Sequence, residues 1–294
     1  MAGTKIIKQK IKAITSIKKI TKTMEMVSFA KMKKSSEEMN KISSYIKESK
    51  NLVESIKSEI KSEFALFNNI KNKTNKEGVE NKDLVIIFAS NKGLCGSFNS
   101  NIYKKTKKLI EQNPNIKNAI CFGKFADKIA KRLGLQIDLS IHDIEKTVSY
   151  TKLLKIEKQI RKQFLDLEYI NIFASYTNFI KNGLYQNETV SIYPVKILEE
   201  KLQENESKEV KQLITFEPDT NILLETLVPK LITIILYSFI LESRASEYSM
   251  RSFAMKRANE SAGELLHTLK IKYNRVRQDS ITQEIAEISA GANA

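Results

Sequence analysis

Glycine and proline are scarce in this 294-residue chain, and the few that occur are unevenly placed. No glycine lies between Gly3 and Gly78, no proline precedes Pro114, and Gly263 is the only residue of either kind between positions 230 and 290. Glycine and proline are the residues that most strongly disfavour a helix interior. Their absence therefore predicts a long, uninterrupted helix at each end of the chain.

Cysteine and histidine are also rare, with only Cys95, Cys121, His142 and His267 present. The two cysteines have no second pair and no nearby histidine in the sequence, so they lack the spacing of a metal site. Free thiols in a reducing compartment are the expected state. We find no combination of residues that would form a nucleophile with its base. The sequence thus predicts no metal, no cofactor and no active site on this chain.

Each end of the chain carries apolar residues in steps of three and four, the repeat of a coiled coil. The N-terminal repeat contains Ile7, Ile11, Ile14, Ile17, Ile20, Met24 and Val27, and resumes with Met39, Ile42, Ile46, Val53, Ile56 and Ile60. The C-terminal repeat contains Leu223, Leu227, Leu231, Ile235, Phe239, Tyr248, Met255, Ala258, Ala262, Leu265, Leu269, Ile281, Ile285 and Ile288. A helix is stabilised mainly by packing an apolar face. The two ends are therefore predicted to pair as an antiparallel coiled coil.

Between the two ends, short apolar runs alternate with helical patterns. Strands are predicted at 84–89, 119–122, 137–141, 170–176 and 190–195, and helices at 98–112, 124–133 and 151–165. Such alternation is typical of a mainly parallel sheet with crossover helices. The predicted fold class is thus a mixed one, with a coiled coil formed by residues 1–80 and 215–294 and a central, Rossmann-like α/β domain at 81–214.

The glycine-containing turn after the first predicted strand is not predicted to bind a nucleotide. It reads SNKGLCGSFNSN and has Gly93 and Gly96, but it has neither the dinucleotide-binding spacing nor a GK[ST] ending. The glycines are expected to shape a tight connection from strand to helix.

Positive charge dominates the chain, which has a formal net charge of +15. The first 36 residues contain ten lysines and one acidic residue, Glu25. A second basic cluster consists of Arg251, Lys256, Arg257, Lys270, Lys272, Arg275 and Arg277. These clusters indicate an acidic protein partner, a nucleic acid or an anionic membrane. A basic coiled-coil module that binds nucleic acid or an anionic membrane therefore remains an alternative function.

Two observations limit that alternative. The basic N-terminal segment has few aromatic residues on which bases could stack. The strongest apolar run, at 231–241, is far shorter than the roughly 20 residues that a membrane-spanning helix needs. We expect this run to be buried in the helical hairpin.

Several motifs resemble one family across the whole chain. They are ITKTMEMVSFAKM at 20–32, SNKGLCGSFNSN at 90–101, FEPD at 216–219, SEYSMRSFAMKRANESA at 246–262 and RQDSITQEIAEISAGA at 277–292. In type and order they resemble the gamma subunit of F-type ATP synthase. The resemblance implies a non-catalytic rotor shaft that lies in the centre of a hexamer of alternating alpha and beta subunits. It also implies that the membrane-facing end of the shaft, called the foot below, binds the epsilon subunit and the ring of c subunits. Proton flow turns this ring.

The resemblance further implies which residues meet these partners. Arg277, Gln278, Thr282 and Glu284 are expected to contact the catch loops of beta. Met24 and Arg251 are expected near the acidic lever segment of beta, and Phe216 and Glu217 near the foot, towards epsilon and the c ring.

The resemblance also predicts a cellular setting. The start MAGTKIIKQKIKAITSIKKITK is similar to a mature N-terminus rather than to a transit peptide, and the inserted cysteine pair of chloroplast members is not found. We therefore expect a bacterial enzyme complex, with this chain peripheral on the cytoplasmic side of the inner membrane.

Overall fold

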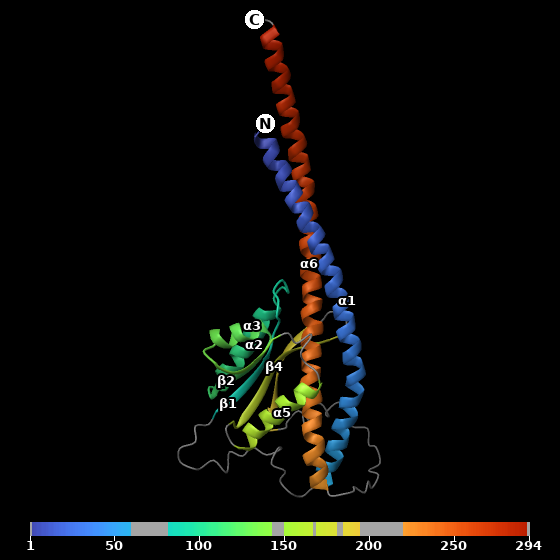
Figure 1. Ribbon diagram of the computed structural model, residues 1–294, viewed down its shortest axis with the longest axis vertical. Helices are drawn as coiled ribbons and strands as arrows, with labels where there is room; N and C mark the ends of the chain where they lie inside the picture. The colour runs from blue at the N-terminus through green and yellow to red at the C-terminus, as the bar shows by residue number, and fades with distance from the viewer. Residues whose placement is uncertain are drawn as a thin grey trace. The chain divides into compact units, whose positions relative to one another are not determined.

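The computed structural model describes residues 2–59, 82–142, 150–166, 169–180, 185–194 and 220–292. The chain divides into two compact units. Unit 1 contains Met1–Ala30 and Ser249–Ala294, and unit 2 contains Lys31–Tyr248. The two terminal helices, α1 (Ala2–Glu59) and α6 (Thr220–Ala292), each contribute to both units (Figure 1). The prediction of a long helix at each end is confirmed. The predicted domain boundaries near residues 80 and 215 lie outside the described residues and stay a prediction.

Unit 2 contains a five-stranded sheet with strand order β3-β2-β1-β4-β5. The strands are β1 (Asp83–Phe88), β2 (Ile116–Phe122), β3 (Gln136–Ile141), β4 (Asn171–Phe179) and β5 (Tyr185–Tyr193). All neighbouring pairs are parallel except β4 and β5, which are antiparallel. The predicted mainly parallel sheet is therefore confirmed.

Helices cover both faces of this sheet. They are α2 (Phe98–Gln112), α3 (Lys124–Arg132) and α5 (Tyr150–Leu165), together with the first part of α6. Alternate residues of β1 point to opposite faces: Leu84, Ile86 and Phe88 join the core that α5 and α6 complete, while Val85 and Ile87 are equally buried on the other face. The helices α2 and α3 lie over that other face (Figure 1). Burial on both faces explains why β1 is a continuous apolar run.

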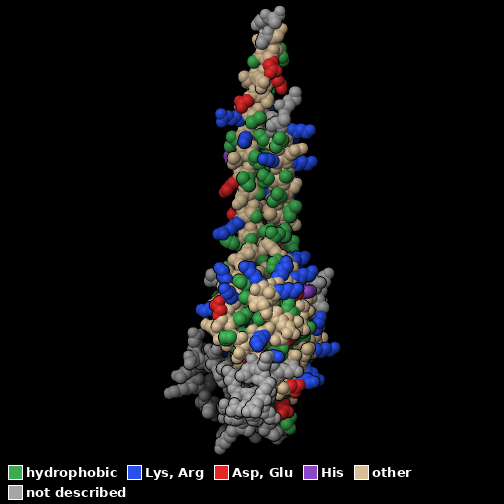
Figure 2. Space-filling view, turned by 90° about the vertical axis from the view of Figure 1, so that its left-hand side faces the viewer, with side chains coloured by type: hydrophobic (Ala, Val, Ile, Leu, Met, Phe, Trp, Pro, Cys, Tyr) green, Lys and Arg blue, Asp and Glu red, His purple; other side chains and the backbone are tan. Residues whose placement is uncertain are grey.

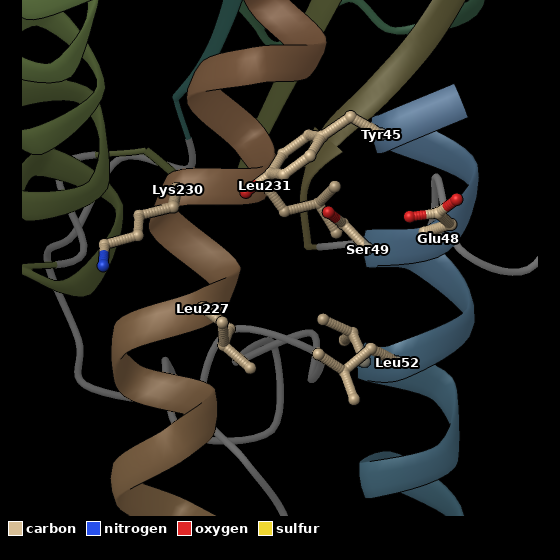
Figure 3. Close-up of a pocket in the computed structure, with 8 residues that line it drawn as sticks. Tyr45, Glu48, Ser49, Leu52, Leu227, Lys230 and Leu231 are labelled. Carbon is tan, nitrogen blue, oxygen red and sulfur yellow. The ribbon is translucent and has the colours of Figure 1, made fainter. Parts of the chain in front are cut away.

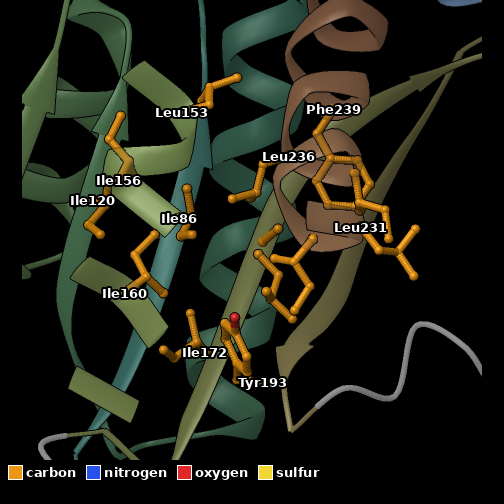
Figure 4. Packing of buried hydrophobic residues seen from close by; sticks show 14 of the residues in the cluster. Ile86, Ile120, Leu153, Ile156, Ile160, Ile172, Tyr193, Leu231, Leu236 and Phe239 are labelled. Atoms are coloured by element: carbon orange, nitrogen blue, oxygen red, sulfur yellow. The ribbon is translucent and has the colours of Figure 1, made fainter. Parts of the chain in front are cut away.

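The core of unit 2 consists mainly of branched aliphatic side chains from the sheet, α5 and α6, with aromatic rings among them (Figure 4). The Phe88 ring stacks on Phe122, with 4.7 Å between ring centroids, and meets the ring of Phe239 edge-on at 6.2 Å. Phe239 also stacks on Tyr176 at 4.0 Å. The α1 residues Val53 and Ile56 join the same cluster. Helix α6 is thus fixed to the sheet by direct ring contacts.

The apolar run of α6 has more partners than the sequence alone indicates. It was expected to be buried in a helical hairpin, but the sheet and α5 share in its burial as well as α1. Among the described residues, α6 is the one helix long and apolar enough to cross a membrane by length and composition, and 56% of its most apolar stretch is buried inside the protein. A core helix passes the same test, so this property is weak evidence for a membrane span.

A buried carboxyl group ties α5 to β5. The Tyr193 hydroxyl donates a 2.7 Å hydrogen bond to Glu157 Oε1, and Arg161 Nε lies 3.2 Å from the same oxygen. Burial raises the pKa of Glu157, against the opposing effects of Tyr193 and Arg161. The pKa of Tyr193 is raised by burial and by the Glu157 charge. Glu157 and Tyr193 thus pair with each other inside unit 2 and have a structural role, while Arg161 Nε takes part through the ion pair without a hydrogen bond.

Gly123 allows the end of β1 and the start of α3 to approach closely. Its φ is +98°, and a Cβ at this position would lie 2.2 Å from the carbonyl oxygen of Ala89. Gly134, at φ +72°, has no atom within 4 Å of the equivalent position. Both glycines have a positive φ, but Gly123, with a ψ of 149°, lies in a region that essentially only glycine adopts, and it is also the more crowded of the two.

We predict that Gly123→Ala lowers the free energy of unfolding by about 2 to 4 kcal/mol, because the new Cβ would overlap a backbone oxygen that cannot swing away. Gly134→Ala is the matched control and should cost only about 1 kcal/mol, since backbone strain is its sole penalty. Urea unfolding of the two variants and of the unmodified chain measures the difference. Equal losses in the two variants would contradict the steric argument.

Candidate partner-binding surface

The structure places the described candidate residues in unit 1. Met24 lies on α1, whereas Arg251, Arg277, Gln278, Thr282 and Glu284 lie on α6. The other two candidates, Phe216 and Glu217, are outside the described residues.

The seam between α1 and α6 in unit 1, meaning the row of side chains where the two helices touch, contains only some of the residues of the predicted apolar repeat. Ile7 is buried and Ile11 and Ile14 are half-buried, as a seam requires. At Ile17, Ile20 and Val27 the prediction is wrong, because these side chains are 52%, 59% and 51% exposed, whereas the predicted residue Met24 is half-buried. The side chains that are buried in this part of α1 are Thr21 and Ser28.

The error has a physical cause. Two stripes run along this part of α1, one polar and one apolar, and both follow steps of three and four. Periodicity alone cannot say which stripe faces the partner helix. The same ambiguity affects α6, where the predicted seam residue Leu265 is 55% exposed and its neighbour Leu266 is half-buried instead.

Small residues bring the two helices of unit 1 close together. Ala262 is buried on α6, and next to it Gly263 leaves room for the side chain of Lys18: a Cβ on Gly263 would lie 3.3 Å from Lys18 Nζ. Ser252 Oγ donates a 3.3 Å hydrogen bond to the carbonyl oxygen of Glu25. This seam buries little apolar area, so it contributes less hydrophobic stabilisation than the core of unit 2.

Large apolar side chains are instead exposed on unit 1. On α1 they are Ile6, Ile17, Ile20, Met26, Val27 and Phe29, and on α6 they are Phe253, Leu265, Ile271, Ile281, Ile285 and Ile288. Most of the exposed large apolar residues in the described structure belong to this smaller unit. Exposed apolar patches of this kind mark interaction sites. We call these residues the apolar surface of unit 1.

Basic side chains lie among the apolar ones. Exposed lysines and arginines of unit 1 include Lys5, Lys8, Lys10, Lys12, Lys19, Lys22, Lys256, Arg257, Lys270, Lys272, Arg275 and Arg277. Figure 2 shows apolar and basic side chains intermixed along the two helices, with some acidic ones among them. A partner that covers this surface must offer apolar contacts and negative charge.

The candidate residues differ in how they meet solvent. Arg277, Gln278, Thr282 and Glu284 are exposed, Met24 is half-buried and Arg251 is 6% exposed. The Thr282 hydroxyl donates a 3.0 Å hydrogen bond to the carbonyl oxygen of Gln278, one helical turn earlier. The C-terminal turns thus present polar side chains together with Ile281, Ile285 and Ile288. The sequence pattern had identified these turns, but it did not show that Arg251 is buried.

A separate hollow in unit 2 was not predicted (Figure 3). It lies between α1 and α6 and has a volume of about 240 Å³. It is lined by Tyr45, Glu48, Ser49, Leu52, Val53, Leu227, Lys230 and Leu231. The Lys230 side chain points away from the hollow in Figure 3. The residues that line the hollow do not form a set of catalytic groups.

No group of three or more histidine, cysteine or acidic residues among the described positions could hold a metal.

Comparison with known proteins agrees with this architecture. The family model described as ATP synthase matches residues 3–294. The ATP synthase gamma chain of Fusobacterium nucleatum is 34% identical over 298 residues, covering 100% of both chains. The ATP synthase gamma chain of Mycoplasma capricolum is 32% identical over 98% of this chain and 97% of its own.

Solved structures show the same fold at lower identity. The rotor of the Euglena gracilis mitochondrial ATP synthase matches with a TM-score of 0.66 at 15% identity, covering 95% of this chain and 99% of its own. The central stalk of the Tetrahymena thermophila mitochondrial enzyme matches with a TM-score of 0.56 at 20% identity, covering 81% of this chain and 99% of its own. The fold is thus that of rotary-motor stalk proteins. From the full-length sequence matches, the chain belongs to the ATP synthase gamma chain family.

The tight approach at Gly263 generates a prediction. We expect Gly263→Ala to slow amide hydrogen exchange in unit 1 by up to about fivefold, because alanine favours a helix interior by roughly 1 kcal/mol and the Lys18 ammonium can move aside. Hydrogen exchange of residues 252–273, measured by mass spectrometry, tests this. Gly263→Leu is the comparison and should speed exchange by forcing the helices apart. Faster exchange in the alanine variant would show that the seam cannot accept even a methyl group.

Proposed function

We propose that this chain is the central rotor stalk of an F-type ATP synthase. It couples the rotation of a c-subunit ring, driven by proton flow, to conformational changes at the catalytic beta subunits, for ATP synthesis or the reverse hydrolysis. It is a non-catalytic subunit of that complex and has no active site of its own. The observation that carries the proposal is the full-length match to gamma chains. The apolar and basic surface of unit 1 supports it.

Such a stalk must interact differently with each of the beta subunits around it, so that each takes a different conformation. A ligand shifts a conformational equilibrium only through different interaction free energies with the alternative states. A rod with the same surface on every side would make the same contacts with all three beta subunits. Unit 1 is not uniform, because it joins two unlike helices and exposes apolar residues on both. Each rotation angle therefore offers a different face to each surrounding subunit.

The contacts of the stalk must also be weak enough to slide. Exposed ion pairs contribute only about 0 to 1 kcal/mol each. The exposed side chains of Arg277, Gln278, Thr282 and Glu284 suit such contacts, and we assign them to the beta catch loops. Met24 and Arg251 are assigned to the neighbourhood of the acidic lever segment of beta. Since Arg251 is buried by its own chain, its contribution is to support that surface from within.

The remaining partners are assigned to the other end of the stalk. The epsilon subunit and the c ring bind the foot, where Phe216 and Glu217 would take part. The chain then reaches the membrane only through the complex. The bacterial origin of relatives such as those of Fusobacterium and Mycoplasma supports a place on the cytoplasmic side of a bacterial inner (plasma) membrane.

Reconstitution tests the proposal directly. ATPase activity of purified alpha and beta subunits from the same organism is measured with and without this chain, after size-exclusion isolation of any complex. We expect one copy of the chain to enter a complex with three alpha and three beta subunits and to raise sustained activity. If the folded chain formed no complex, the better explanation would be a basic coiled-coil module that binds nucleic acid or an anionic membrane. Its binding would weaken steeply with salt.

We predict that Met24→Lys reduces proton pumping per ATP hydrolysed while the complex still assembles. The half-buried methionine would be replaced by a charge that needs water, at a position assigned to the beta contact. Proton uptake into inverted membrane vesicles, divided by phosphate release, measures the coupling.

Thr23→Lys is the matched control, because it adds the same charge one residue away on another side of the helix. Thr23 is already polar and exposed and is not part of the apolar surface of unit 1, so we expect a smaller loss of coupling. An equal loss in both variants would attribute the effect to net charge rather than to the position of Met24.

A further inference from the structure

The side of unit 2 that α2 and α3 cover carries many lysines, and the proposed rotor role does not use them (Figure 1). On each helix the basic residues follow steps of three or four, so they lie along one side. We call six exposed residues the basic face of unit 2: Lys104, Lys108, Lys124, Lys128, Lys131 and Arg132. This face is separate from the basic clusters of α1 and α6.

The two helices form a fixed platform for these charges. The Arg132 guanidinium lies 4.6 Å from the centroid of the Tyr103 ring, which joins the end of α3 to α2. The opposite sides of the helices are buried, through Ile102 and Leu109 on α2 and Ile129 on α3. Because their apolar sides are held against the sheet, the helices keep their basic sides towards solvent. A partner would therefore meet charges whose backbone positions are already set.

Little negative charge balances the basic face. Each of the two helices has four basic residues and one acidic residue. Glu111, the acid of α2, lies 3.7 Å from Lys107. Asp127, the acid of α3, accepts a 2.7 Å hydrogen bond from Ser140 and lies 2.6 Å from His142 Nε2. Both carboxylates are thus engaged by neighbours in unit 2, and the face has a positive potential.

The basic face differs from the apolar surface of unit 1. Neither α2 nor α3, both of which the structure describes in full, has a large apolar side chain that is exposed. The Phe125 ring is half-buried, and the Lys128 ammonium lies 4.7 Å from its centroid. Lasting protein interfaces have an apolar core, whereas exposed ion pairs are weak and are screened by salt. The face is therefore suited to a partner that is held by charge.

We propose that the basic face of unit 2 binds an acidic polypeptide segment of a neighbouring subunit. The segment is rich in aspartate and glutamate and poor in apolar residues, because the face offers charge without an apolar anchor. Several weak ion pairs hold it, and the opposite charges speed its association. Such a contact also exchanges quickly, which suits a stalk that turns past its neighbours. The inference rests on the proposed function, since the neighbour belongs to the complex that the stalk enters.

The position of the face favours a protein over a membrane. The helices α2 and α3 lie on one side of the sheet, and the first part of α6 packs on the other (Figure 1). The outer surface of α2 and α3 is therefore parallel to this part of α6. In a stalk whose α6 shaft stands on the membrane, the basic face points sideways and does not lie flat on the lipid surface.

The chemistry of the face also argues against nucleic acid. Arginine is the residue that recognises phosphates through paired hydrogen bonds, and the one arginine of the face is stacked on Tyr103. Single strands bind through free aromatic faces, whereas Lys128 lies over the Phe125 ring. Separate lysine charges fit the carboxylates of an acidic segment.

The test is cross-linking without a spacer in the intact complex. The complex is purified from cells that carry the unmodified chain or the triple variant Lys104→Glu, Lys108→Glu, Lys131→Glu. A carbodiimide joins lysine amines to carboxylates in contact with them, and mass spectrometry identifies the linked peptides. In the unmodified complex we expect Lys124 and Lys128 to be linked to one acidic segment of another subunit. In the triple variant we expect these links to fall by about tenfold, because the new carboxylates repel the segment.

Two controls address charge and folding. The α5 variant Lys155→Glu, Lys158→Glu, Lys162→Glu makes the same change in charge with exposed lysines on the other face of the sheet. Its links from Lys124 and Lys128 should stay within about twofold of those in the unmodified complex. The thermal midpoints of both variants should agree closely with that of the unmodified chain, because all the substituted side chains are exposed.

The possible outcomes separate this inference from the proposed function. If the purified complex lacked this chain, the proposed function would fail. If the chain were present but Lys124 and Lys128 formed no links, or formed them equally in the triple variant and the α5 variant, only the acidic-segment proposal would be overturned. Absence of links, together with flotation of the unmodified chain but not of the triple variant with phosphatidylglycerol vesicles, would identify a membrane as the occupant and likewise overturn it.

Discussion

The packing of α6 against the sheet is the contact on which the structure of unit 2 depends. Phe239 meets both Phe88 and Tyr176, so a single residue of the helix joins two adjacent strands. Residues of α1 and α5 complete the same core. Because protein interiors are close-packed, this contact fixes the rotation of α6 about its own axis within unit 2.

Unit 1 follows a different principle. Beyond Ile14, its helices approach through small and polar side chains such as Thr21, Ser28 and Ala262, while Ile17 and Ile20 are exposed. An isolated pair of helices would normally bury its largest apolar residues. Large apolar residues on the outside are favourable when other proteins surround the pair, since the outer surface of the helices then becomes part of a larger core. The exposed apolar residues are thus better explained by the assembly than by the stability of the free chain.

Local rules were sufficient for most of the secondary structure. The absence of glycine and proline indicated both terminal helices, and α2 begins and ends where the sequence pattern predicts. Strands β1 and β4 were recognisable as apolar runs because both faces of the sheet are covered. The candidate residues near the C-terminus were identified by resemblance, and the structure places their side chains in solvent. Their partner contacts stay predictions.

What the sequence determined by itself is the set of elements, because helix breakers and apolar periodicity act over a few residues. Only the tertiary structure decided which of two equally spaced stripes on α1 faces α6, that Arg251 is buried, and that Leu94 stands exposed on a left-handed backbone. Those features depend on contacts between residues far apart in the chain. A side chain's periodic position limits which faces are possible, but the shape of the opposing helix or loop selects among them.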